Sequence, residues 1–245
     1  SIKTKEDMKN ITKLMFSALL ALGLSTSAYS FEGFSIGAIY SQSDFDAKGK
    51  EHKVSDGSTL TTTTGNDTES VDVPSVFAEY TFAQGSTIGV EYIPGDAVIG
   101  NKARTHTANT GTPNTGHRSA GTITAKAEVS DHITFYVEPT YMMSENFGVY
   151  VKGGASNVTV ESLENMGATG NLSTYGNQDV WGVSYGAGFK YSTGNYFAKL
   201  EHLETEYGTV SLTSTTGNKN TVEADFESTA TRFARSEERR VGKEC

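Results

Sequence analysis

The stretch WGVSYGAGFKY, Trp181 to Tyr191, alternates strictly between two kinds of side chain. Its odd positions are apolar, and its even positions are small or polar. A period of two predicts a β-strand with one apolar and one polar face. The same letters include Gly182-Val183-Ser184-Tyr185-Gly186, which fits the G-x-S-x-G nucleophile elbow of serine hydrolases. Because an elbow needs a sharp turn from strand into helix and the alternation runs unbroken through Ser184, we predict a strand residue without a catalytic role.

The length of this strand and the size of its polar face suit a membrane barrel. Ten steps of about 3.3 Å, tilted by about 40°, rise roughly 25 Å, which is the height of the apolar band on outer-membrane barrels. The polar face consists of Gly182, Ser184, Gly186, Gly188 and Lys190. Such small residues fit the crowded interior of an eight-stranded barrel.

Seven other segments have the composition or alternation of strands, and three pairs of strands meet across short polar turns. The turns are 83–86, 143–146 and 192–195. Within the longest segment, Ser130-Asp131-His132 is a candidate β-bulge. The seven segments are Phe31–Gln42, Pro74–Phe82, Thr87–Ile93, Thr122–Met142, Phe147–Gly154, Tyr196–Leu203 and Thr221–Ala234.

Four long segments rich in Thr, Asn, Gly and Ser separate the strands at the other end, and their composition is that of loops. They are 46–70, 95–121, 161–178 and 211–221. Long connections at one end and short ones at the other are typical of outer-membrane proteins. We therefore predict an all-β, eight-stranded antiparallel up-and-down transmembrane β-barrel with four long external loops and short periplasmic turns.

The alternation also predicts which side chains face lipid and which face the lumen. Charged side chains in the lumen must pair, because an unpaired buried charge is costly. The alternative is a soluble barrel with a solvated charged face. The predicted lipid-facing and girdle residues are Phe82, Tyr141, Phe147, Trp181, Val183, Tyr185, Phe189, Tyr191 and Tyr196. The predicted lumen charge network is Glu79, Glu91, Lys126, Glu128, Glu138, Lys152, Lys190, Lys199 and Glu201.

Both ends of the chain differ from this pattern. A basic start at Met8, an apolar run and small residues predict a signal peptide within residues 1–30, cleaved between Ser30 and Phe31. Residues Arg235–Cys245 resemble the translation of a sequencing adapter, which predicts a non-native tail. The barrel, 31–234, then holds 12 Lys and Arg against 24 Asp and Glu, a net charge of −12, and lacks cysteine. This charge argues against nucleic-acid binding.

No residue pattern predicts a cofactor or a metal site. The five histidines have no partner at metal-ligand spacing, and we expect them in solvent or in hydrogen bonds. The pair Gly186 and Gly188 lacks the third glycine of a dinucleotide loop. The histidines are His52, His106, His117, His132 and His202.

The signal peptide, the eight strands and the loop asymmetry together resemble the small OmpA-like and opacity-type outer-membrane barrels of Gram-negative bacteria. The resemblance spans Phe31 to Ala234. It implies outer-membrane lipids and the barrel-assembly machinery as partners. In this family the machinery recognises an aromatic residue at the end of the last strand. The last strand of this chain carries Phe226 and Phe233.

We expect a non-enzymatic envelope protein with a structural role or a surface partner bound through its loops. One alternative is a secreted or periplasmic lipocalin-like carrier with a cavity lined by Val183, Tyr185 and Phe189. Another is a lipid A-modifying enzyme. Outer-membrane enzymes that remove acyl chains from lipid A would have a His-x-Ser pair on a late strand, as base and nucleophile. This chain has His202-Leu203-Glu204 there, without the serine.

Overall fold

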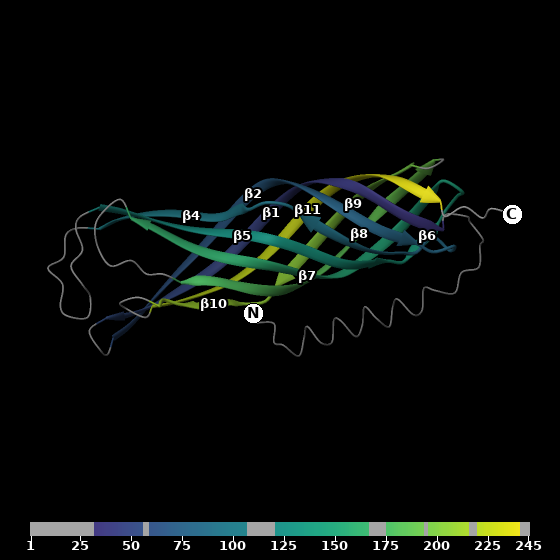
Figure 1. Ribbon diagram of the computed structural model, residues 1–245. Helices are drawn as coiled ribbons and strands as arrows, with labels where there is room; N and C mark the ends of the chain where they lie inside the picture. The colour runs from purple at the N-terminus through teal and green to yellow at the C-terminus, as the bar shows by residue number, and fades with distance from the viewer. Residues whose placement is uncertain are drawn as a thin grey trace.

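The computed structural model describes an all-β protein (Figure 1). It describes residues 32–55, 59–106, 121–166, 175–193, 196–215 and 220–240. The predicted signal peptide and its cleavage site lie outside these residues. The strands are β1 (Gly33–Ser55), β2 (Thr59–Thr81), β3 (Thr87–Ile93), β4 (Ala97–His106), β5 (Gly121–Glu138), β6 (Thr140–Met142), β7 (Phe147–Met166), β8 (Gly176–Thr193), β9 (Tyr196–Tyr207), β10 (Val210–Thr213) and β11 (Thr221–Arg240).

These segments make eight barrel strands, because three of the eight are interrupted. Pro94-Gly95-Asp96 separates β3 from β4, Pro139 separates β5 from β6, and Gly208-Thr209 separates β9 from β10. Proline lacks the N–H that a strand ladder uses, and glycine weakens a strand interior. The interruptions therefore fall where the sequence has the poorest strand formers.

The sheet closes into a ring of antiparallel neighbours. The order around the ring is β1, β2, β3, β5, β7, β8, β9 and β11, and β11 pairs with β1 again. Each of these eight strands thus has a paired neighbour on both sides over part of its length, so the sheet closes on itself, as a membrane-spanning sheet requires. The predicted eight-stranded up-and-down barrel is confirmed. The end of β11, Arg235–Arg240, continues this pairing along Gly33–Ala38.

The two ends of the barrel differ in the length of their connections (Figure 1). At one end the turns are short: the N–H of Phe82 donates to the carbonyl of Ser86 at 2.8 Å. Gly85 in this turn has φ +90°, a conformation that glycine adopts without steric cost. Residues 143–146 form the second short turn, as predicted. The third, at 192–195, is shorter than predicted, because β8 and β9 stay paired up to Thr193 and Tyr196.

At the opposite end, the described residues of the segments predicted as loops are largely strand. β1 and β2 remain paired out to Ser55 and Thr59, so the predicted loop 46–70 is a long hairpin arm. Within the second segment, β4 (Ala97–His106) pairs with the start of β5, β7 reaches Met166, and β10 lies within the fourth segment. The composition was misleading because threonine is β-branched and favours strands. We call these extensions the hairpin arms.

The predicted bulge in β5 is present and changes which residues face inward. The pairing of β5 with β7 shifts between Ser130 and Ile133, and Asp131 has a positive φ of 50°. Two residues of β5 thus lie opposite one residue of β7, which reverses the alternation along β5. Val129 packs inside the barrel on one side of the bulge, and Tyr136 is buried inside on the other.

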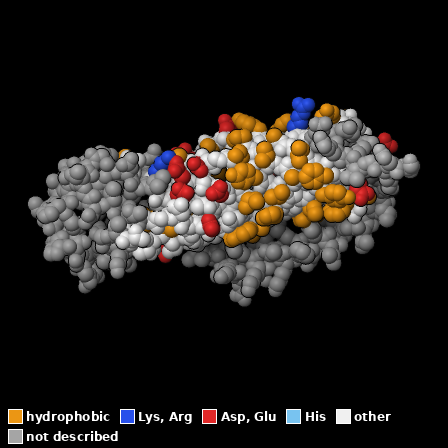
Figure 2. Space-filling view, viewed as in Figure 1, with side chains coloured by type: hydrophobic (Ala, Val, Ile, Leu, Met, Phe, Trp, Pro, Cys, Tyr) orange, Lys and Arg blue, Asp and Glu red, His pale blue; other side chains and the backbone are white. Residues whose placement is uncertain are grey.

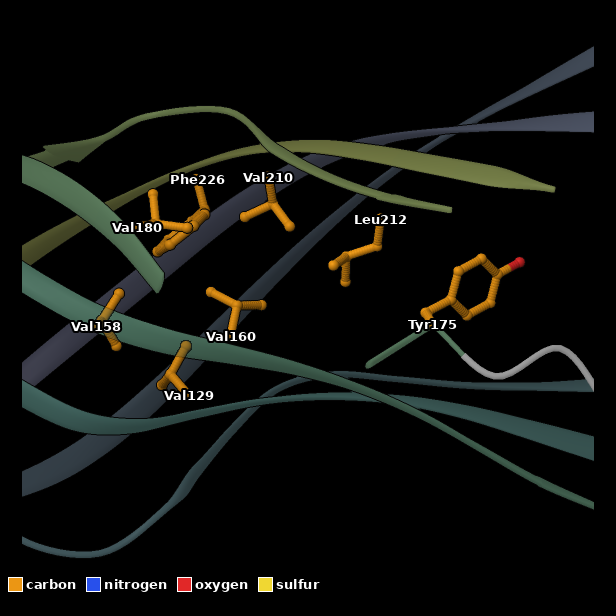
Figure 3. Close-up of a cluster of buried hydrophobic side chains, with 8 residues drawn as sticks. All are labelled: Val129, Val158, Val160, Tyr175, Val180, Val210, Leu212 and Phe226. Atoms are coloured by element: carbon orange, nitrogen blue, oxygen red, sulfur yellow. The ribbon is translucent and has the colours of Figure 1, made fainter. Parts of the chain in front are cut away.

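The barrel interior has two layers of different chemistry. Near the hairpin arms, apolar side chains from several strands converge on one another (Figure 3). Toward the short turns, the interior is filled by charged and hydroxyl side chains. The apolar layer consists of Val129, Val158, Val160, Tyr175, Val180, Val210, Leu212 and Phe226.

Glycine in β3 makes room for a tyrosine that fills the lumen. A Cβ at Gly89 would lie 2.4 Å from Cζ of Tyr136. We therefore expect Gly89→Ala to destabilise the barrel by about 1–3 kcal/mol through overpacking. Urea unfolding in lipid vesicles would measure this change. Gly49→Ala is the control, because its Cβ would meet only the carbonyl of Glu223 at 3.7 Å and should shift stability by about 0.5 kcal/mol or less. Equal effects of both substitutions would contradict the packing argument.

Candidate functional site

The outer wall of the barrel carries a band of exposed apolar side chains (Figure 2). Trp181 and Phe189 are 56% and 51% exposed on β8, and Leu200 on the neighbouring β9 is 51% exposed. Phe82, Tyr141, Tyr191 and Tyr196 are also exposed. Phe147, Val183 and Tyr185 lie on the same outer face but are partly covered. The space-filling view shows acidic side chains gathered at the border of this band, on the side of the hairpin arms.

Inside the barrel, four acids and four bases form one continuous chain of ion pairs. The order is Lys190, Glu79, Lys199, Glu138, Lys152, Glu201, Arg232 and Glu91, with opposite charges alternating throughout. All eight side chains are buried. The charges sum to zero, so each buried carboxylate is compensated by a neighbouring cation.

The distances along this lumen network are short. Lys199 Nζ lies 2.7 Å from Glu79 Oε2 and 2.5 Å from Glu138 Oε2. Lys152 Nζ lies 3.2 Å from Glu138 Oε1 and 3.1 Å from Glu201 Oε1. The guanidinium of Arg232 lies 3.1 Å from Glu201 Oε1 and also pairs with Glu91.

Tyrosines and hydroxyl groups complete the packing of the lumen. The hydroxyl of Tyr136 donates to Glu79 at 2.8 Å, and that of Tyr150 donates to Glu201 at 2.9 Å. Lys152 Nζ also lies 4.0 Å from the centre of the Tyr136 ring, which adds a cation–π contact. These contacts draw on strands all around the ring, so the network holds the walls of the barrel together.

Two residues predicted for the network are not part of it. Lys126 and Glu128 pair with each other, and their side chains are 38% and 17% exposed. They lie beyond the β5 bulge, where Val129 and Ala127 pack into the apolar layer, so the even positions of β5 point outward there. The prediction applied one alternation to the whole strand, whereas the bulge reverses it. The other seven predicted lumen residues lie within the network.

The predicted network lacked Arg232. This residue pairs with both Glu91 and Glu201, at the Glu91 end of the chain of ion pairs. Its position could have been found from the alternation of β11, because Phe226, Ala230, Arg232 and Ala234 share one buried face. The two lumen tyrosines gave a weaker signal, since an aromatic residue on a strand can face either lipid or the lumen.

Ser184 lies in the lumen wall, not in a nucleophile elbow. It is 1% exposed and sits in the middle of β8. Its hydroxyl lies 2.6 Å from that of Ser156 and 2.8 Å from that of Thr205. A row of hydroxyl groups across neighbouring strands accounts for the small polar residue at this position.

The structure contradicts the lining predicted for a soluble carrier. Val183, Tyr185 and Phe189 belong to the outer face of β8 and not to a cavity. His202 of the deacylase comparison is exposed on β9, where Ala187 and Thr231 are its neighbours on the adjacent strands. Among the described residues, no three His, Cys, Asp or Glu side chains gather as a metal site.

An apolar exterior around a charged, paired interior reverses the arrangement of a soluble protein and suits a barrel surrounded by lipid. The protein is a transmembrane β-barrel. A closed antiparallel barrel with an even number of strands, short turns at one end and long connections at the other is the form found in the bacterial outer membrane. The described residues include no helix long and apolar enough to cross a membrane.

No protein-family model matches the sequence, and no curated protein matches it either. Among solved structures, Ail of Yersinia pestis, in complex with the heparin analogue sucrose octasulfate, is 13% identical with a TM-score of 0.35, covering 82% of this chain and 99% of Ail. OprG of Pseudomonas aeruginosa is 12% identical with a TM-score of 0.40, covering 85% and 99%. The outer-membrane protease OmpT of Escherichia coli is 9% identical with a TM-score of 0.40, covering 88% and 99%.

The fluorescence of Trp181, the only tryptophan of the chain, can show how deep the edge of the apolar band lies in the bilayer. Trp181 is 56% exposed at the end of the band nearest the hairpin arms. Aromatic residues at this depth lie among lipid headgroups. We expect brominated lipids to quench Trp181 fluorescence, most strongly when the bromine lies near the headgroup. Quenching that is strongest with bromine at the bilayer centre would contradict this placement.

Proposed function

We propose that the protein is a non-enzymatic outer-membrane barrel that closes its own lumen and acts through its hairpin arms. The observation that carries the proposal is the eight-residue lumen network. The network occupies the part of the lumen through which a pore would have to pass. The interior of an eight-stranded barrel is only wide enough to be filled by side chains. The burial of Ser184 within a hydroxyl row supports the absence of serine-hydrolase activity.

Conductance in planar bilayers tests the closed lumen. We expect the purified barrel to show no stable channel steps, because buried ion-paired side chains occupy the lumen of a narrow eight-stranded barrel. Lys199→Met, which removes one central cation, is the comparison, and it should open at most transient leaks. Regular steps from the unaltered protein would overturn the closed lumen.

The hairpin arms are the surface that we propose for contact with a partner outside the cell. The arm formed by β1 and β2 is a paired ribbon, and its exposed side chains are polar or charged. Hydroxyl–carboxylate hydrogen bonds across it, from Thr68 to Asp46 and from Ser70 to Asp44, both at 2.5 Å, hold it in register. A rigid ribbon loses less entropy on binding than a mobile loop does.

Shortening this arm separates a contact role from a structural one. Lys48 and Asn66 are partners in the register, so the strands can be cut there and joined by an Asn-Gly turn. We expect cells with the shortened protein to keep detergent resistance but to lose adhesion to other cells. Lost detergent resistance with unchanged adhesion would favour a purely structural role. No change in either would contradict the proposed contact role of this arm.

We further propose that outer-membrane lipids surround the apolar band and that the barrel-assembly machinery inserts the protein. The exposed aromatic residues of the band support the lipid contact. Phe233, exposed on the outer face of β11, is the aromatic residue that we propose as part of the assembly signal.

A further inference from the structure

A cavity of about 340 Å³ lies between the two layers of the barrel interior. Arg232 and Glu91, which end the lumen network, line one side of it. Val73, Val129 and Phe226 are among the apolar side chains that line the rest. An engineered apolar cavity of about 150 Å³ holds benzene, so this space admits a larger molecule.

Two buried polar atoms of this cavity have no hydrogen-bond partner among the described residues. They are Oε2 of Glu91 and Nδ1 of His132. The other carboxylate oxygen of Glu91 is used by Arg232 and Ser75, and Nε2 of His132 lies 2.8 Å from the hydroxyl of Tyr207. Buried polar groups are nearly always satisfied, so these two atoms indicate a missing partner.

The cavity reaches the barrel surface at a gap in strand pairing. β2 pairs with β3 only from Val76 to Thr81, and beyond that point β4 pairs with β5 but not with β2. Residues on both sides of this gap line the cavity, including the exposed Asp72, Pro74 and Val98. Tyr92 and Val76, exposed in the apolar band, lie next to the gap. The opening is therefore at the border between lipid and water.

We propose that this cavity binds a small apolar molecule that carries one hydrogen-bond donor, such as an aromatic alcohol. The apolar body would lie against Val73 and Phe226. Its donor would bond to Oε2 of Glu91, whose other carboxylate oxygen pairs with Arg232. His132 would donate from Nδ1 to the ligand oxygen when Tyr207 donates to Nε2. This binding role goes beyond the closed-barrel function proposed above.

Three probes of similar size separate recognition of the donor from simple apolar burial. They are 1-naphthol, 1-methoxynaphthalene, which keeps the oxygen but lacks the donor, and naphthalene. Equilibrium dialysis against the barrel in lipid nanodiscs, with empty nanodiscs subtracted, gives each affinity. We expect saturable binding of 1-naphthol, about tenfold or more tighter than that of the other two, because a hydrogen bond to a charged group is lost in them.

Filling the cavity locates the site. Ala230 is buried and lines the cavity, so Ala230→Leu should weaken 1-naphthol binding about tenfold or more. Ser43→Leu, from β1, is a second filling variant in case the first fails to fold. Ala187→Leu makes the same change on the lipid face and should leave binding unaltered.

Three results would each overturn the proposal. The first is the absence of saturable binding above empty nanodiscs, which would mean that water satisfies the two polar atoms. The second is equal affinity for all three probes, which would mean that no donor is recognised. The third is unchanged 1-naphthol binding in a folded Ala230→Leu or Ser43→Leu variant, which would place the binding elsewhere.

Discussion

Lys199→Met is expected to destabilise the barrel by about 3–5 kcal/mol, the range found when one partner of a buried ion pair is removed. Lys199 Nζ lies 2.7 Å from Glu79 and 2.5 Å from Glu138, and all three side chains are almost fully buried. Methionine keeps most of the volume but leaves the two carboxylates with one cation fewer. Urea unfolding from lipid vesicles, followed by circular dichroism, measures the change in the free energy of unfolding.

Two further variants test the cause of this loss. Lys126→Met breaks the ion pair with Glu128 on the outer side of β5, where exposure should limit the cost to about 1 kcal/mol or less. The double variant Lys199→Met, Glu138→Gln restores equal numbers of acids and bases in the lumen. We expect it to be more stable than Lys199→Met alone. If Lys126→Met costs as much as Lys199→Met, burial is not the source of the effect.

Val151→Arg is expected to destabilise the barrel by about 2–4 kcal/mol, because the arginine would face lipid near the bilayer midplane. Val151 is 48% exposed on the outer face of β7, and its neighbours are Ala187 on β8 and, on the other side, Pro139, whose carbonyl accepts the backbone N–H of Val151 at 3.2 Å. It lies midway along the part of β7 that the apolar band covers. The same unfolding measurement in lipid vesicles gives the effect.

The control for this substitution lies on a hairpin arm. Glu69 is exposed on β2, beyond the apolar band, and Glu69→Arg should change stability by about 0.5 kcal/mol or less. An arginine tolerated equally well at both positions would mean that Val151 faces water. That result would remove the lipid-facing assignment of the outer wall.

Much of the barrel could be predicted from local alternation. The strand from Trp181 to Tyr191 keeps its two faces because its side chains alternate without interruption. The short turns at 83–86 and 143–146 follow from glycine and polar residues between strands. The sequence also predicts the bulge at Ser130-Asp131-His132, but the same alternation does not show that this bulge turns Lys126 and Glu128 outward.

The candidate cavity could not be predicted in the same way. Glu91 and Arg232 are 141 positions apart, and only the closed ring brings them into contact. The gap between β2 and β4 depends on which strands find partners beyond Val76, and no local pattern in either strand shows it. A cavity is the space that packing leaves unfilled, so it depends on all of its walls at once.

The sequence by itself determined the number of barrel strands, the lipid-facing side of β8 and the asymmetry of the two ends, because a period of two and the turn residues act locally. Only the tertiary structure decided that the long polar segments form hairpin arms, because strand pairing there depends on partners held by the barrel. It also decided how the charges pair: a buried carboxylate is stabilised by whichever cation the register brings within reach, and the register around a closed ring is a property of the whole sheet.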